Sequence, residues 1–292
     1  MSSFFRSVLD YLSLVRFGHT VFAMPFALIG FFLAISREEY SFSLRLFLLV
    51  ILCMIFARNA AMGFNRLADK KYDALNPRTK NREIPSGRIS TRSAAVFVLV
   101  NSVLFIIAAG LINRLTLLLS PVALIIILGY SLSKKITALC HFILGLGLSL
   151  APVGAYISVT GSFALLPIIY SLIVLTWVSG FDIIYALQDD EFDKNNRIYS
   201  IPSVTGRKRA LAIAALIHFI TAILIIYAGY IDNGGIFFWT GALVFILLLI
   251  YQHLIVKPDD LSRVNVAFGT TNGIASILFA AFVIADLFIK NH

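Results

Sequence analysis

The segment FALLPIIYSLIVLTWVSGFDIIYALQDDEFD, residues 163–193, runs from a long apolar stretch directly into a group of carboxylates. Its apolar part, residues 163–186, is long enough to cross a bilayer core of about 30 Å as a helix. Asp182 is the one charged residue in that part, and Asp189 and Asp193 follow closely. The segment therefore predicts a transmembrane helix with a polar site at one end.

The rest of the chain is equally apolar. Of its 292 residues 59% are hydrophobic and only 13% are charged, whereas a soluble domain carries about 25% charge. The fold class predicted is all-α: a polytopic membrane protein formed by a single domain over residues 1–292, with nine transmembrane helices in a bundle. The predicted spans are 19–36, 45–66, 93–112, 115–133, 138–158, 163–186, 209–230, 236–256 and 265–289.

The charges indicate how these spans are oriented. With nine spans, eighteen Lys and Arg residues fall on the side of the N-terminus and four on the other side. Because basic loops stay in the cytoplasm, the N-terminus and the loops between spans 2–3, 4–5, 6–7 and 8–9 are expected to be cytoplasmic. The same placement explains the net charge of +9 without a nucleic-acid partner. Residues 1–17 are expected to form an interfacial helix, since their apolar side chains share one face.

Two cytoplasmic stretches concentrate the acidic residues. The first is NRLADKKYD, with Asn65, Asp69 and Asp73 at spacings of four, and the second is the end of the segment quoted above. At 100° per residue each set is expected on one helical face, within about 80°. Like charges at this spacing destabilise a helix unless a cation lies between them. The first face is expected to carry Arg58, Asn65, Asp69 and Asp73, and the second Asp182, Tyr185, Asp189 and Asp193.

The two stretches have the same spacing and similar continuations, NREIPSGR at 81–88 and NRIYSIPSVTGR at 196–207. We interpret this as an internal repeat of a four-helix unit, whose two copies form one site between them. Mg²⁺ binds one or two carboxylates together with phosphate oxygens. Acidic residues for a metal and basic residues for phosphate occur in the same loops. This combination favours a diphosphate substrate over a simple cation site.

Some polar residues lie at membrane depth, where they are costly and usually functional. Arg58 suits a carboxylate-bearing acceptor, because a guanidinium binds a carboxylate in a bidentate manner. Asp286 is expected to be an inward structural residue. His141 has no metal-ligand spacing, and we expect it to serve in packing or hydrogen bonding. Gly145, Gly147 and Gly154 are expected to permit close helix approach.

These residues carry a resemblance to the UbiA superfamily of intramembrane aromatic prenyltransferases, over essentially the whole chain. The first family signature, N-D-x-x-D-x-x-x-D followed by R-T-x-x-R-P and S-G, stands here as Asn65, Arg66, Asp69, Asp73, Arg78, Thr79, Arg82, Ser86 and Gly87. The second, D-x-x-Y-A-x-x-D-x-x-x-D, is matched by Asp182, Tyr185, Ala186, Asp189 and Asp193. The third, Y-x-x-x-K-R/K-x-T, is matched by Tyr130, Lys134, Lys135 and Thr137. Arg66 departs from the family, which often has Asp there, and removes one carboxylate from the first cluster.

The resemblance implies a bundle around a central cavity that the acidic loops cap. It implies that an allylic polyprenyl diphosphate ionises with Mg²⁺ as cofactor and that an electron-rich ring carbon of a small aromatic acid attacks it. The implied metal ligands are Asp69, Asp73, Asp189 and Asp193, and the implied diphosphate contacts are Arg78, Arg82 and Lys134. The implied acceptor-side residues are Arg58, Asn65, Tyr130, Asp182 and Tyr185, with Asp182 counted among the catalytic residues.

Within the superfamily, the second signature is most similar to the 4-hydroxybenzoate polyprenyltransferases of bacterial quinone (ubiquinone or menaquinone) biosynthesis. That branch implies the bacterial cytoplasmic (inner) membrane. A dihydroxynaphthoate prenyltransferase of menaquinone synthesis is the alternative for the acceptor. Another membrane lipid-diphosphate transferase is less favoured, because the D-G-x-x-A-R element of CDP-alcohol phosphatidyltransferases is missing. A transporter is also less favoured, since transporter sites lie near the bilayer midplane.

Overall fold

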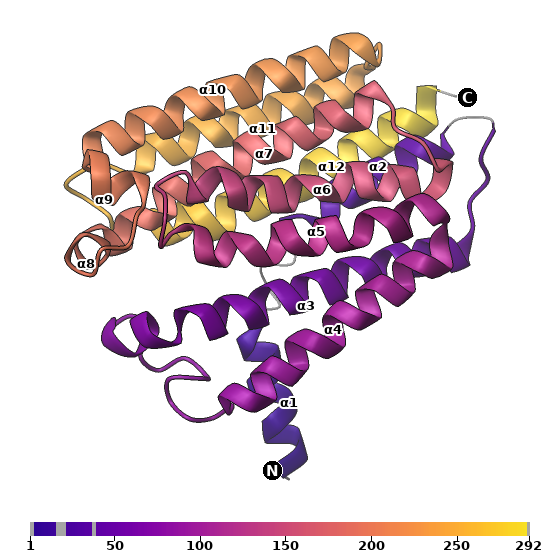
Figure 1. Ribbon diagram of the computed structural model, residues 1–292. Helices are drawn as coiled ribbons and strands as arrows, with labels where there is room; N and C mark the ends of the chain where they lie inside the picture. The colour runs from indigo at the N-terminus through magenta and orange to yellow at the C-terminus, as the bar shows by residue number, and fades with distance from the viewer. Residues whose placement is uncertain (1–2, 16–21, 37–38, 291–292) are drawn as a thin grey trace.

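The computed structural model describes residues 3–15, 22–36 and 39–290, and side chains in the first helix from residue 9 onward. Within these ranges the regular structure is helical throughout (Figure 1). The helices are α1 (Ser3–Leu14), α2 (Met24–Ile35), α3 (Leu44–Leu75), α4 (Thr91–Ile112), α5 (Arg114–Ser133), α6 (Cys140–Thr160), α7 (Leu165–Ala186), η2 (Leu187–Asp189), α8 (Asp190–Asn195), α9 (Ile201–Thr205), α10 (Arg207–Ile231), α11 (Ile236–Ile255), η3 (Val266–Thr271) and α12 (Asn272–Lys290).

Eight helices of the described chain are long and apolar enough to cross a membrane, and α2 is a shorter apolar helix. The long ones are α3 to α7, α10, α11 and α12, each with its short extensions. Part of the first predicted span, residues 19–21, lies outside the described residues. The predicted all-α membrane architecture is confirmed.

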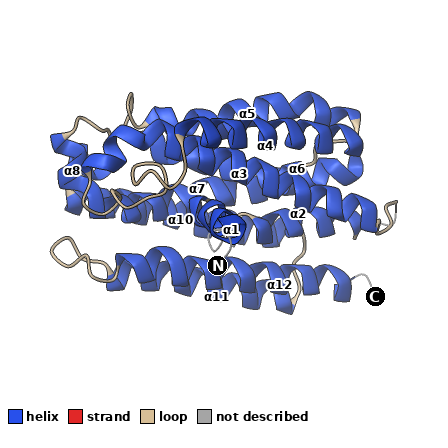
Figure 2. Cartoon of the chain, turned by 90° about the horizontal axis from the view of Figure 1, so that it is seen from below, coloured by secondary structure: helices blue, strands red, loops and turns tan. Residues whose placement is uncertain are grey.

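The bundle is organised around α7, the most buried of the spans. Figure 1 shows α7 among α6, α10, α11 and α12, and Figure 2 shows α11 and α12 side by side along one edge. The Trp177 side chain at its centre is fully buried and packs against Phe26 and Phe245, with ring centroids 5.3 Å and 5.6 Å away. Aromatic rings from α2, α7 and α11 therefore form the centre of the main apolar core.

Two predicted helices are interrupted. We expected one helical face to carry Asp182, Tyr185, Asp189 and Asp193, and this is wrong, since α7 ends at Ala186 and a 3₁₀ turn precedes α8. Asp189, with φ −115° and ψ 8°, leaves the helical conformation. The interactions of its carboxylate with another loop, described below, offset the lost helical geometry.

The second interruption lies at the start of the ninth predicted span, where η3 is a π-helix. A π-turn is rare in helices and leaves carbonyl groups without their usual partners. The Asn272 side chain donates to the carbonyl oxygens of Ala267 at 2.8 Å and Phe268 at 3.2 Å. Its own oxygen accepts from Trp177 Nε1 at 2.8 Å. A buried amide thus holds the wide turn against α7.

Of the three glycines expected to allow close packing, one does so. A Cβ atom on Gly145 would lie 2.5 Å from the carbonyl oxygen of Leu175, so α6 and α7 could not approach as they do. A Cβ on Gly147 would make only ordinary contacts, and one on Gly154 would meet nothing within 4 Å. The expectation is confirmed at Gly145 and wrong at the other two, which face more open space.

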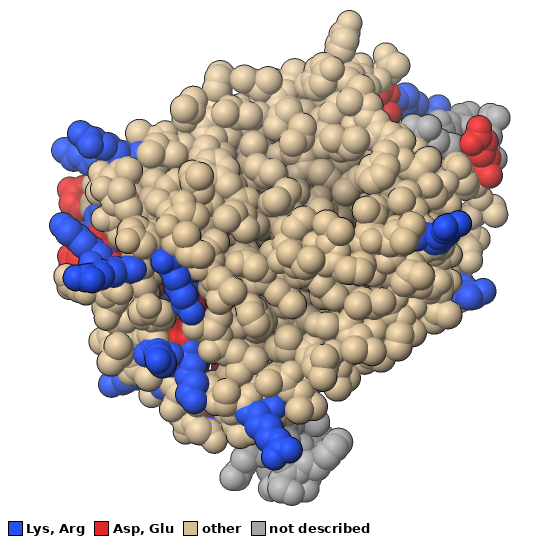
Figure 3. All heavy atoms as spheres, viewed as in Figure 1, with Lys and Arg blue, Asp and Glu red and all other residues tan. Residues whose placement is uncertain are grey.

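Charged side chains gather at one end of the bundle. In Figure 3 the Lys and Arg residues lie mainly at the left, around a smaller group of acidic residues, and the middle of this face is nearly free of charge. That end carries the loops 76–90 and 187–206, which also lie together in Figure 1. We call them the first and second cap loops.

The far end of the bundle depends on Asp286 of α12. Its side chain is 4% exposed and accepts from the backbone N–H groups of Gly235 at 2.8 Å and Phe238 at 3.2 Å. These groups belong to the first turn of α11, which has no side-chain cap of its own. Because such orphan N–H groups need an acceptor, Asp286 is a structural residue, as expected.

Replacing Asp286 should therefore destabilise the fold. We expect Asp286→Ala to lower the free energy of unfolding by about 1–3 kcal/mol, since buried N–H groups lose their acceptor. Asp286→Asn, which keeps one acceptor oxygen, should lose less. Thermal unfolding in detergent measures both, with exposed Asp259→Ala as the control, expected within about 0.5 kcal/mol of wild type. A Tm of Asp286→Ala equal to that of the control would contradict the capping role.

Candidate active site

The two acidic motifs meet through the first cap loop. Arg78 donates from Nε to Asp189 Oδ1 at 3.0 Å and forms an ion pair through Nη2 with the other oxygen. Its Nη1 donates to the hydroxyl of Tyr185 at 3.2 Å. Asn76 also donates to Asp189, at 3.0 Å. A residue of the first signature thus holds two residues of the second, which lie more than 100 positions later in the chain.

Burial and pairing act in opposite directions on Arg78. Burial disfavours its charged form, but the hydrogen bonds to Asp189 and the charge of that carboxylate outweigh this effect and raise the pKa of Arg78 above its ordinary value. The guanidinium is therefore cationic at any physiological pH. Its side chain is 32% exposed, so it remains accessible from the end of the bundle that carries the two cap loops.

The third signature is joined to the same cluster. Lys134, which follows α5, forms an ion pair with the buried Asp69. Lys135 donates to the carbonyl oxygen of Ala68 at 2.7 Å. The carbonyl of Lys134 accepts from the backbone N–H of Tyr199 in the second cap loop, at 2.7 Å. Three stretches distant in sequence are therefore linked at one end of the bundle.

The remaining predicted ligands lie in the same cluster. Arg82 donates to Asp73 at 2.7 Å, and Asp73 is 5% exposed. Asp193, on α8, lies close enough to Asp189 and Lys134 for their charges to act on it.

Two carboxylate oxygens of the first motif are suited to bind a cation. Asp69 Oδ1 and Asp73 Oδ2 are buried and accept no hydrogen bond from the described residues. A buried acceptor without a partner is costly, and a cation would remove that cost. No group of three or more His, Cys, Asp and Glu side chains is close enough to hold a metal within the described parts of the chain. Mg²⁺ usually combines one or two carboxylates with water and substrate phosphate oxygens, and these two carboxylates suit such a shell.

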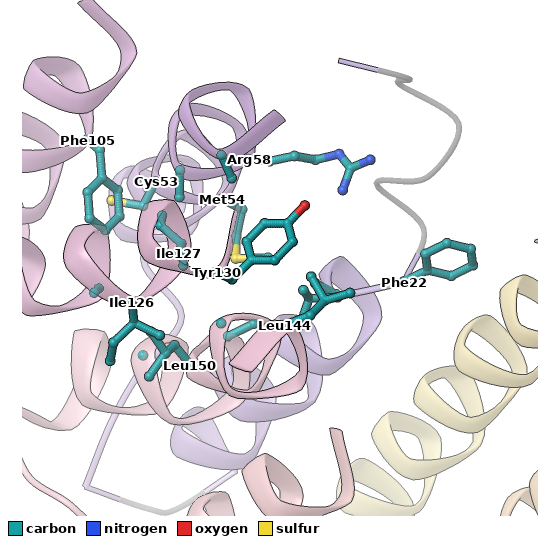
Figure 4. Close-up of a pocket in the computed structure, with 18 of the residues that line it drawn as sticks. Phe22, Cys53, Met54, Arg58, Phe105, Ile126, Ile127, Tyr130, Leu144 and Leu150 are labelled. Carbon is teal, nitrogen blue, oxygen red and sulfur yellow. The ribbon is translucent and has the colours of Figure 1, made fainter. Parts of the chain in front are cut away.

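A cavity of about 490 Å³ extends from this cluster into the bundle. Most of its lining is apolar and comes from α3, α4, α5, α6 and α7, and charged and polar side chains form the rest. Of the residues predicted from sequence, Arg58, Asn65, Arg82, Tyr130, Asp182 and Tyr185 line it. In Figure 4 the polar ends of Arg58 and Tyr130 point to one side of the cavity, near Phe22, whereas Cys53, Phe105 and Ile126 lie on the other.

Tyr130 lies at the centre of the polar end. Its hydroxyl is within electrostatic reach of Asp69, Asp182, Arg66 and Arg58. The cavity therefore contains both positive and negative groups around the Tyr130 hydroxyl. We call the cluster at this end of the bundle, where Asp69 pairs with Lys134 and Asp189 with Arg78, the mouth of the cavity. The structure brings all the predicted residues to the mouth or to the cavity.

The departure at Arg66 has a local explanation. Arg66 is 3% exposed, lines the cavity, and has its Nε 3.9 Å from a carboxylate oxygen of Glu83. Burial alone would raise the pKa of Glu83, but the hydrogen bond from Ser13 and the charges of Arg66 and Arg88 outweigh it and lower that pKa. Arg66 therefore supplies a positive charge that Glu83 balances, in the place where the family often has a carboxylate.

Three aromatic residues of the site escaped prediction. Phe22, Phe181 and Phe268 line the cavity beside Tyr185, and the Phe268 ring stacks on Tyr185 with centroids 4.1 Å apart. Phe268 also packs against Phe181 at 5.4 Å. No spacing in the sequence marks Phe268, because the π-turn of η3 sets its direction.

His141 was also missed as part of the site. It is 2% exposed and its Nδ1 lies 2.7 Å from Oδ2 of Asp182. The expectation of a hydrogen-bonding role is confirmed, but its partner lines the cavity. One signal was present, since His141 lies four residues after Thr137 of the third signature.

Comparison with known proteins agrees with this geometry. Residues 23–283 match the UbiA prenyltransferase family. The chain belongs to this family. Its UbiA fold is also that of a UbiA homolog from Aeropyrum pernix K1 in its apo form, with a TM-score of 0.79, 28% identity, and coverage of 93% of this chain and 98% of that one.

Other relatives carry more specific names. The 4-hydroxybenzoate octaprenyltransferase of Nitrosomonas europaea is 31% identical, over 82% of this chain and 81% of its own length. That of Aliivibrio fischeri strain MJ11 is 29% identical, over 82% and 83%. A UbiA homolog from Archaeoglobus fulgidus, solved bound to GPP and Mg²⁺, has a TM-score of 0.74 at 24% identity and covers 96% of this chain and 99% of that one, and it shares the fold.

The bridge made by Arg78 predicts that the two cap loops are stabilised together. We expect Arg78→Ala to increase amide hydrogen exchange in residues 76–90 and 187–200 by about tenfold, because charge-assisted hydrogen bonds are lost from both. Lys80→Ala, an exposed change in the same loop, is the matched control and should leave both segments at the wild-type rate. Faster exchange in only the first loop would contradict the bridge.

Proposed function

We propose that this protein is a Mg²⁺-dependent 4-hydroxybenzoate polyprenyltransferase of quinone biosynthesis. It transfers the prenyl chain from an allylic polyprenyl diphosphate to a ring carbon of the aromatic acid. The single observation that carries the proposal is the contact of Arg78 with Asp189 and Tyr185, which joins the family's motifs at the mouth of an apolar cavity. Membership of the family and the names of the relatives support the same reaction.

The mouth suits a diphosphate and its metal. Asp69, Asp73, Asp189 and Asp193 would hold Mg²⁺, which would neutralise and polarise the diphosphate as the carbon–oxygen bond breaks. Arg78, Arg82 and Lys134 would exchange their present carboxylate partners for phosphate oxygens. Positive groups held at the place where negative charge develops stabilise the departing diphosphate.

The cavity suits the prenyl chain and the cation formed at its end. Apolar side chains of five helices line it, and the faces of Phe181, Tyr185 and Phe268 are available to an allylic cation. Two lining residues, Val122 and Phe163, are about half exposed. A tail longer than the cavity would leave the bundle beside them and continue into the bilayer.

The polar end suits a small aromatic acid. Arg58 would bind its carboxylate, and Asn65, Tyr130 and Asp182 would surround the ring. The relatives from Aliivibrio fischeri and Nitrosomonas europaea, which are named for 4-hydroxybenzoate, favour that acceptor over a dihydroxynaphthoate. The bundle would lie in the inner membrane of a bacterium, with the N-terminus and the cap loops facing the cytoplasm. The aromatic acid and the diphosphate group of the prenyl donor would reach the site from that side.

Removing one carboxylate from either motif should stop the reaction. We expect Asp69→Asn and Asp189→Asn to lower product formation by at least about a hundredfold, because ligands from both motifs are needed for the metal-bound diphosphate. EDTA should stop the wild-type enzyme and added Mg²⁺ should restore it. Mass spectrometry of products from membranes supplied with geranyl diphosphate and a panel of hydroxybenzoates and dihydroxynaphthoates measures both effects and identifies the acceptor.

The exposed Asp259→Asn is the matched control, since it makes the same isosteric change outside the site. It should keep wild-type activity. Wild-type rates in either motif variant, or turnover that persists in chelator, would reject the metal assignment.

Changing Arg58 should affect the two substrates differently. We expect Arg58→Ala to raise the KM for the aromatic acid by about 10–100-fold, because the charge-assisted hydrogen bonds to its carboxylate are lost. The KM for the diphosphate should change less than about twofold, because Arg58 is not among the residues proposed to hold the diphosphate or its metal. Steady-state kinetics with each substrate varied in turn tests this, and equal losses for both would refute the role.

A further inference from the structure

One buried side chain touches the site from outside the cavity. His141, at the start of α6, is 2% exposed and contacts Asp182 of α7 and the N-terminus of α9. Nδ1 lies 2.7 Å from Asp182 Oδ2, and Nε2 lies 3.2 Å from the backbone nitrogen of Ile201. Both ring nitrogens therefore have a partner, and one partner reaches the cavity.

The partners determine where the proton of the ring lies. The backbone nitrogen of Ile201 is a donor, so Nε2 accepts and carries no hydrogen. Nδ1 must then carry the hydrogen and donate it to Asp182, because a carboxylate accepts. An imidazolium would present N–H groups at both nitrogens and would face the Ile201 N–H with another donor. The contacts thus select the neutral Nδ1–H form of His141.

One carboxylate oxygen of Asp182, Oδ2, contacts His141, and the other, Oδ1, is available to a ligand. Its Oδ1 accepts no hydrogen bond from the part of the chain that the structure describes, and its side chain is 23% exposed along the cavity. Among the described residues, no Lys or Arg side chain forms an ion pair with Asp182, and the His141 ring is its one basic neighbour at ion-pair distance. Oδ1 of Asp182 therefore remains available to accept a hydrogen bond on the side of the cavity where Tyr130 also lies.

We propose that His141 is a positioning residue: as a neutral imidazole it holds Asp182 so that Oδ1 accepts a hydrogen bond from the ring hydroxyl of the aromatic acceptor. This inference rests on the proposed function and adds a selectivity determinant to it. A hydroxyl that donates to a carboxylate gains electron density, and the ring carbons ortho to it become better nucleophiles. With Arg58 on the carboxylate and Asp182 on the hydroxyl, a 4-hydroxybenzoate is fixed at both ends of its ring.

Two substitutions separate hydrogen bonding from packing. Gln in place of His141 offers an N–H to Asp182 and an oxygen to Ile201 and is always neutral, whereas Leu fills similar space with neither. We expect His141→Leu to raise the KM for 4-hydroxybenzoate by about tenfold and to lower kcat, with the KM for geranyl diphosphate unchanged. His141→Gln should stay within about threefold of wild type in all three constants.

Equilibrium binding of two ligands tests the hydroxyl directly. Benzoate lacks the hydroxyl, so the preference of the wild type for 4-hydroxybenzoate over benzoate should fall by about tenfold in His141→Leu, with benzoate affinity unchanged. Asp182→Ala should lose the same preference, which keeps the test available if His141→Leu does not fold. His218→Leu is the matched control, a buried histidine bonded to His253 and Trp177. It should lower the Tm without changing the preference.

The outcomes are distinct. Equal weakening of both ligands in His141→Leu, an unchanged preference, or a His141→Gln variant as impaired as His141→Leu would each overturn the positioning role. A wild-type protein that binds both ligands but forms no prenylated product would instead overturn the proposed function. The binding measurements therefore test the role of His141, and the turnover measurement separately tests the proposed function.

Discussion

A charge that enters a membrane protein must find a partner, because lipid offers neither water nor counterions. This constraint arranges the molecule. Nearly all the acidic residues proposed to act in catalysis lie at one end of the bundle. Asp69, Asp73 and Asp189 each pair with a Lys or Arg there. Two of the pairs, Arg78 with Asp189 and Lys134 with Asp69, join segments far apart in the chain, so the same contacts assemble the site and hold that end of the bundle together.

The same pairs explain how a site can be organised and still bind a strongly charged ligand. Guanidinium and ammonium groups that contact carboxylates are already placed for phosphate oxygens, and the carboxylates are already placed for a cation. Asp69 and Asp73 each keep one buried oxygen without a hydrogen bond among the described residues. Opposite charges that neutralise each other in the protein therefore become complementary to a metal-bound diphosphate, whose own charges have the same two signs.

Behind the mouth, packing rather than charge decides the shape. A π-turn in η3, held by Asn272 and through it by Trp177, directs Phe268 onto Tyr185. His141, at the start of α6, holds Asp182 of α7. The residues that face the cavity thus depend on a layer of buried polar side chains that do not line it, an arrangement common where geometry must be exact to a few tenths of an ångström.

Hydropathy and helical periodicity are local properties of the chain, and they were enough to predict the membrane class, the approximate spans, the two acidic motifs and most of the residues around the site. The packing of the helices determines which carboxylate meets which base, that α7 breaks before Asp189, and that His141, Phe22 and Phe268 belong to the site. Those facts depend on contacts between helices distant in sequence, such as Arg78 with Asp189, and no local pattern encodes the relative placement of two packed helices.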